Sequence, residues 1–89
     1  MEDNVKSEVR QFILKKFPLA KKQNVSDDGA LLESGMLDSQ GVLEVVNFIE
    51  QQYSMVVSDE DLVPENFQSI DRIAGFVRGR MTGAPLVQH

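Results

Sequence analysis

The sequence predicts an all-α protein, a bundle of three main helices and one short helix. Three segments repeat apolar residues at intervals of three and four, which is the spacing of one face of an α-helix. The only strand-like run, Met55-Val56-Val57, is short and has no partner strand, so we expect a packed loop there. At 89 residues the chain has room for one domain, and its hydrophobic fraction of 42% is typical of a folded one.

The first helix is expected from about Asp3 to Phe17. Its apolar stripe consists of Val5, Val9, Phe12, Ile13 and Phe17. Asp3 or Asn4 can cap its start, and Pro18 ends it because proline cannot continue a helix. Residues 19–38 then form a long connection with turn-prone Asp-Gly and Ser-Gly pairs. A connection of this length in a small domain is usually functional or well packed, and Leu31, Leu32 and Leu37 are expected to hold it to the core.

The clearest helix is expected from Ser39 to Tyr53. Its inward stripe consists of Val42, Val45, Val46, Ile49 and Tyr53. Asp38 stands at the N-cap position, and Ser39 opens the first turn. Gly41 is a poor helix former, but in the first turn its missing side chain is expected to clear space around Ser39.

Two more helical segments follow. Ser58 is expected to cap a short helical turn that starts with Asp59-Glu60-Asp61 and is ended by Pro64. Phe67 is expected to anchor the next loop. Ser69 caps the last helix. Its inward stripe consists of Ile70, Ile73, Ala74 and Val77, with Phe76 beside it. Residues 79–89 are expected to form a flexible tail.

The charge pattern is more uneven than the net charge of -5 suggests. Residues 23–71 contain eleven Asp and Glu residues and no Lys or Arg. This acidic stretch is either a solvated surface that keeps the protein soluble or a docking face for basic partners. It disfavours nucleic acid as a partner, because the phosphates would meet the acidic residues.

Several functional classes are excluded by composition. The chain has no cysteine and one histidine, His89 at its end, which disfavours catalysis or metal binding by these residues. It has no P-loop, and Ser39 lacks the G-x-S-x-G elbow and the histidine base of a serine hydrolase. No apolar run reaches the roughly 20 residues of a membrane span, and the acidic N-terminus is not a signal peptide. We therefore expect a cytoplasmic protein without catalytic activity, membrane association or bound metal.

Ser39 is the residue best placed to carry a modification. A phosphodiester at the start of a helix meets backbone N–H groups and the positive end of the helix dipole. Taken alone, Ser39 is better explained as an ordinary helix-start serine.

The residues around Ser39 resemble the acyl carrier protein family. The resemblance lies in Leu31-Leu32-Glu33-Ser34-Gly35-Met36-Leu37-Asp38-Ser39, followed by Val42-Leu43-Glu44-Val45-Val46. Tyr53 falls at the aromatic position that ends the family's second helix, and the likeness extends from about Val5 to Val77. It implies a four-helix carrier domain over residues 1–78. In that domain Ser39 would hold a 4′-phosphopantetheine arm, with Asp38 as its accompanying acid, and acyl or aminoacyl groups would ride on the arm as thioesters.

The resemblance also implies a set of partners. They are a phosphopantetheinyl transferase, an adenylating acyl or aminoacyl ligase, and downstream acyltransferases or synthases that meet a monomeric carrier. The docking residues would be Gln40, Leu43, Glu44, Asn47 and Glu50. Family members most often have Leu where this chain has Gln40. That departure points to a specialised polyketide, nonribosomal peptide or lipid pathway rather than general fatty-acid synthesis.

Two other functions remain open at this stage. One is a helical interaction module that binds a partner helix and never carries a cofactor. The other is a calcium-responsive acidic protein that uses Asp27, Asp28 and residues 59–61. Neither alternative has a positive motif in the sequence.

Overall fold

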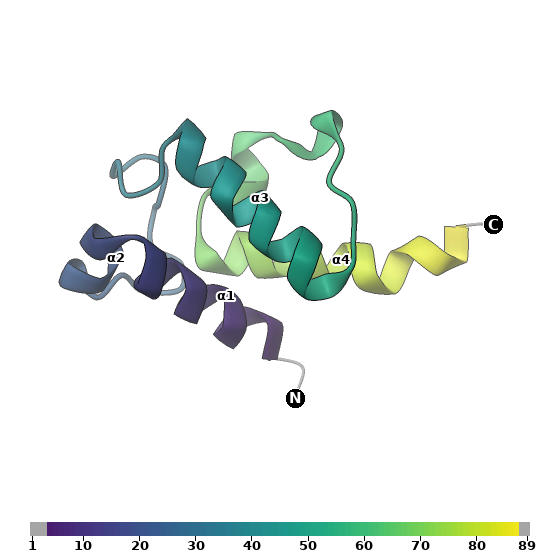
Figure 1. Ribbon diagram of the computed structural model, residues 1–89, viewed down its shortest axis with the longest axis horizontal. Helices are drawn as coiled ribbons and strands as arrows, with labels where there is room; N and C mark the ends of the chain where they lie inside the picture. Colours follow the sequence, from purple (N-terminus) through teal and green to yellow (C-terminus); the bar gives the residue numbers. More distant parts are fainter. Residues whose placement is uncertain (1–3, 88–89) are drawn as a thin grey trace.

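Three long helices make up the body of the protein (Figure 1). The computed structural model describes residues 4–87, with side chains through Met81. Its helices are α1 (Asn4–Lys16), α2 (Pro18–Gln23), α3 (Ser39–Tyr53) and α4 (Ile70–Val87), with two 3₁₀ turns, η1 (Asp59–Asp61) and η2 (Pro64–Phe67). In Figure 1, α1 and α3 run in opposite directions, α4 lies behind them, and its last turns project beyond the bundle. The described part of the chain contains no strand, so the expectation of an all-α bundle is confirmed.

One apolar core joins the helices. Its buried members are Val5, Val9, Ile13, Ala20, Val25, Leu31, Leu37, Val45, Ile49, Phe67, Ile70, Ile73, Ala74 and Val77. The expected stripes supply most of this list, with Phe12, Phe17, Val42, Val46 and Tyr53 partly buried at its edges. The core therefore forms where helical periodicity placed it, because burial of these stripes is the main favourable term in folding.

The caps expected at Asp38, Ser58 and Ser69 are present. The Asp38 carboxylate accepts a hydrogen bond from the Gly41 N–H at 2.8 Å. The Ser69 hydroxyl accepts one from the Arg72 N–H at 3.1 Å. Ser58 and Asp61 form a reciprocal capping box around η1. These bonds satisfy backbone donors that have no partner inside a helix.

The connection between the first two expected helices contains a helix of its own. Pro18 ends α1, as expected, but it also opens α2, because proline fixes a helical φ and lacks only an N–H that the first turn would leave unpaired. Asn24 ends α2 in the left-handed conformation, with φ 51°. The expectation that residues 19–38 form one long connection is therefore wrong in its first part.

The rest of this connection is held to the core by its leucines, as expected. Leu31 and Leu37 are buried, and Leu32 is half-buried. The Leu31 N–H donates to the Gln68 carbonyl at 2.7 Å. The Asp71 N–H donates to the Asp27 carbonyl at 2.9 Å.

Two boundaries in the second half of the chain were expected wrongly. Pro64 does not end the acidic turn but starts η2, again as the first residue of a helical turn. The last helix does not end before Gly79, since α4 is helical to Val87. Flexibility of residues 79–89 stays a prediction, and both Asp3 and His89 lie outside the described residues.

Candidate functional site

Ser39 is exposed at the first position of α3. Asp38 precedes it in extended conformation and caps the helix, while its own carbonyl accepts the first helical bond from the Val42 N–H at 2.9 Å. The Asp38 carboxylate is thus hydrogen-bonded to the backbone of the first turn of α3, which begins at Ser39. The Ser39 hydroxyl stands at the positive end of a 15-residue helix.

Gly41 places this first turn against the core. A Cβ added to Gly41 would lie 2.8 Å from Leu37 Cδ1 and 3.0 Å from Phe17 Cε1, closer than carbon atoms normally approach. Gly41 is itself buried, whereas Ser39 faces solvent. The expectation that Gly41 clears space around Ser39 is therefore wrong. Its missing side chain admits Leu37 and Phe17, which fixes the start of α3 against the α1–α2 corner.

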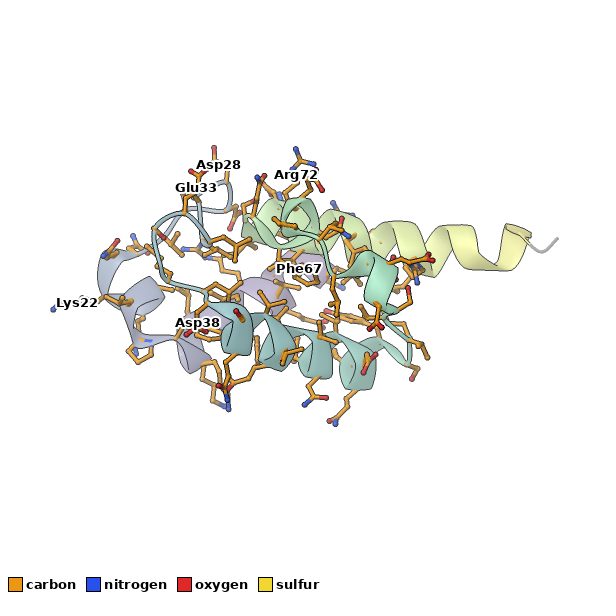
Figure 2. All side chains as sticks on the ribbon, turned by 90° about the horizontal axis from the view of Figure 1, so that it is seen from above. Lys22, Asp28, Glu33, Asp38, Phe67 and Arg72 are labelled. Carbon is orange, nitrogen blue, oxygen red and sulfur yellow. The ribbon has the colours of Figure 1, made fainter. Side chains whose placement is uncertain are left out.

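An apolar cleft of about 370 Å³ lies beside Ser39. We call it the Ser39 cleft. Its lining from α3 consists of Ser39, Val42 and Leu43, next to Asp38, and its opposite side consists of Leu62, Val63 and Pro64, with Leu32 and Phe67 completing it. Figure 2 shows Phe67 between α3 and α4, with Asp38 at the start of α3. Seven of the nine lining residues are apolar, so the cleft favours an apolar ligand.

Polar contacts hold the segment opposite α3. The Glu50 carboxylate accepts a hydrogen bond from the Val57 N–H at 2.9 Å. Asp61 accepts from both the N–H and the hydroxyl of Ser58, and it forms an ion pair with Arg80 of α4. Burial disfavours ionisation of Asp61, but the hydrogen bonds from Ser58 and Arg80 outweigh it, so the pKa of Asp61 lies below its ordinary value.

The five expected docking residues do not share one environment. Gln40, Leu43 and Asn47 are exposed on α3, and Leu43 keeps 57% of its surface accessible at the rim of the Ser39 cleft. Glu44 is half-buried, and together with Asn47 it lines a different cleft, between α1 and α3. Glu50 is half-buried and bonded to Val57. A docking role for each of the five stays a prediction.

The acidic residues are spread over several surfaces. Some of them form ion pairs within the fold, among them Asp27 with Arg10, Asp71 with Lys6, and Asp61 with Arg80. Asp28 and Glu33 line a polar cleft of about 340 Å³ with Arg72, on the edge of the molecule away from α3 (Figure 2). The acidic middle of the sequence therefore does not form one continuous face around Ser39.

Sequence reasoning missed part of the site. The residues opposite α3, Leu62 to Pro64, were assigned only to the end of a short turn, and Arg80 was assigned to a tail. The apolar pair Leu62-Val63 between acidic residues was a usable signal for a half-buried wall. The ion pair between Arg80 and Asp61 could not be predicted from the sequence, because 19 positions separate the two residues. The last helix was also expected to end before Gly79, which left Arg80 outside it.

A search for metal sites and membrane spans in the described residues finds neither. No three His, Cys, Asp or Glu side chains within residues 4–81 are grouped as a metal would require. None of the helices in that part of the chain has the length and apolar character needed to cross a bilayer.

Comparison with known proteins adds no assignment. No protein-family model matches this chain, and a search of curated proteins finds no match in sequence.

Proposed function

We propose that this protein is an acyl carrier that holds a 4′-phosphopantetheine arm on Ser39. The observation that carries the proposal is the position of Ser39, an exposed hydroxyl at the start of α3 on the rim of an apolar cleft. An attachment residue must be reachable by a modifying enzyme, and its cargo must find a nearby apolar surface. Ser39 meets both requirements.

The attachment step is a phosphoryl transfer from coenzyme A. The Ser39 hydroxyl oxygen attacks the phosphorus that bears pantetheine, a new P–O bond forms, and the anhydride bond to the nucleotide breaks. Adenosine 3′,5′-bisphosphate leaves with the bonding electron pair, and the hydroxyl proton passes to a base of the transferase. The product is a phosphodiester whose negative charge is favoured at the N-terminus of α3.

The cleft indicates the kind of cargo. The lining is apolar, and Leu43 and Leu62 in it are exposed. Contact with an apolar acyl chain would bury this surface at a favourable free energy, whereas a charged aminoacyl group would lose its hydration there. We therefore favour acyl over aminoacyl cargo. The protein itself contributes no catalytic group, and its partners supply the chemistry.

The partners would be a phosphopantetheinyl transferase, an adenylating ligase, and acyltransferases or synthases that use the loaded arm. Next to Ser39 these enzymes would meet the exposed, uncharged side chains of Gln40 and Leu43, with Asn47 about two turns further along α3. The polar Gln40 directly after the attachment residue supports a specialised pathway with dedicated partners.

Intact-mass analysis tests the attachment directly. The protein is incubated with coenzyme A and a broad-specificity phosphopantetheinyl transferase, and the modified peptide is then mapped. We expect a gain of one phosphopantetheine on the peptide that contains Ser39. Ser39→Ala should show no gain while keeping its helical circular dichroism, and Ser7→Ala, which removes an exposed serine of α1, should be modified like the wild type.

Two results would overturn the proposal. A mass gain in Ser39→Ala would move the site to another residue. Unmodified wild-type protein that is well folded would instead favour the helical interaction module without a cofactor.

A further inference from the structure

We propose that Arg80 is the positioning residue of the Ser39 cleft. Through Asp61 it fixes the outer wall of the cleft, which we define as Leu62, Val63 and Pro64, and so sets how tightly an apolar group is held beside Ser39. This inference rests on the proposed function only for the nature of that group, because the wall and its contacts belong to the protein before any modification.

Arg80 connects α4 to the segment before the outer wall through two contacts, and a third contact, with Phe76, holds its guanidinium on α4. Its guanidinium forms an ion pair with the Asp61 carboxylate. It also donates to the Val56 carbonyl at 3.3 Å. The guanidinium lies over the Phe76 ring, 5.3 Å from the ring centroid, where a cation–π attraction favours it. A planar group with several donors suits this role, since it can meet a carboxylate, a carbonyl and a ring together.

Asp61 transmits this contact to the outer wall. The Asp61 carboxylate accepts from the Ser58 N–H at 3.1 Å and from the Ser58 hydroxyl at 3.0 Å, which closes η1. The Asp61 carbonyl accepts from the Asn66 side-chain amide at 2.8 Å, which ties η1 to η2. Leu62, Val63 and Pro64 lie between these two tied points, so their position follows that of Asp61.

Apolar burial alone does not fix the outer wall. Phe67, just after the wall, is buried, but Leu62 and Pro64 are exposed and Val63 is half-buried. An apolar side chain contributes strongly to stability through the hydrophobic effect only when folding removes much of its surface from water. The wall is therefore anchored by burial at its Phe67 end and by Asp61 and Arg80 at the other.

Amide hydrogen exchange on the unmodified protein tests this arrangement. The reporters are the Asp61, Leu62 and Asn66 N–H groups, which donate to the carbonyls of Ser58, Asp59 and Val63. In Arg80→Gln we expect these amides to exchange faster by up to about five-fold, the upper end of the range for loss of a partly exposed ion pair. Core amides of α1 and α3 should keep their rates, and Arg80→Lys should restore part of the protection.

A matched control and a ligand readout accompany the exchange measurement. Arg72→Gln removes the same charge from the same helix, but from an exposed side chain on a different cleft, and should leave the reporters unchanged. Binding of the neutral apolar dye N-phenyl-1-naphthylamine should weaken about three- to five-fold in Arg80→Gln, because a wall that is not held in place must be ordered by the ligand.

The outcomes separate this inference from the proposed function. Unchanged reporter amides in Arg80→Gln, or faster exchange spread over the whole core, would overturn the positioning role. Either result would leave phosphopantetheine loading at Ser39 intact. Conversely, a wild-type protein that is never loaded would end the carrier proposal and leave the exchange result standing.

Discussion

The two walls of the Ser39 cleft are held by different forces. On one side α3 is a regular 15-residue helix whose inner residues Val45 and Ile49 are fully buried. On the other side two short 3₁₀ turns and a loop are held by Phe67, by the Glu50–Val57 bond and by the Asp61–Arg80 ion pair. One wall thus depends mainly on burial, and the other depends largely on polar contacts.

This difference assigns the two walls different tasks. A helix with a buried stripe opens only when much of the core opens with it. A segment with exposed side chains and few buried anchors opens at much lower free energy. The cleft therefore has a rigid wall, α3, which carries Ser39. Opposite it lies an adjustable wall, which consists of η1, the outer wall and Phe67. Such an arrangement suits a site that must hold and release a group.

The largest expected effect comes from the one buried anchor of the adjustable wall. Phe67→Ala removes a fully buried ring that also lines the cleft, and we expect a loss of about 3–5 kcal/mol in the free energy of unfolding, measured by urea titration. Phe67→Leu should lose less of the free energy of unfolding than Phe67→Ala and should keep the fold. Val56→Ala, at a side chain with 76% of its surface exposed, should stay within about 0.5 kcal/mol of the wild type. An equally small change for Phe67→Ala would show that the wall has no apolar anchor.

A smaller effect is expected at the base of the rigid wall. Gly41→Ala gains helix propensity but brings its Cβ against Leu37 and Phe17, so we expect a net loss of about 1–2 kcal/mol in thermal or urea unfolding. Gly75→Ala is the matched control, because a Cβ there meets nothing within 4 Å. It should stabilise the protein by about 0.5–1 kcal/mol. If Gly41→Ala were also stabilising, the close approach at the start of α3 would be refuted.

The smallest effect is expected from pH at the adjustable wall. The folded-state pKa of Asp61 lies below the unfolded value, so its contribution is present above the unfolded pKa and is lost as pH falls through the folded one. Arg80 is the charged group that faces it from α4, and Asp59 and Glu60 are its neighbours in η1. The free energy of unfolding, measured by urea titration, should be higher for the wild type than for Asp61→Asn by less than about 1 kcal/mol at pH 7. This difference should disappear as the pH is lowered toward 3. A difference that stays constant with pH would show that ionisation of Asp61 does not contribute to the stability of the fold.

The sequence by itself determined the elements whose signals are local. The bounds of α3, its Asp38 cap, the inward stripe of α4 and the Ser58–Asp61 turn all follow from neighbouring residues, because capping and helical periodicity act within one or two turns. Ser39 could be singled out for the same reason, since a serine after an N-cap is a local feature.

Only the tertiary structure decided what depends on residues distant in the chain. Gly41 is buried because Leu37 and Phe17 meet there, and α4 packs against α1 and η2. The Ser39 cleft needs α3 and the outer wall to face each other, and that wall takes its place through Arg80, 19 positions after Asp61. Contacts of this kind arise from packing among helices, and no local propensity encodes which distant side chains will meet.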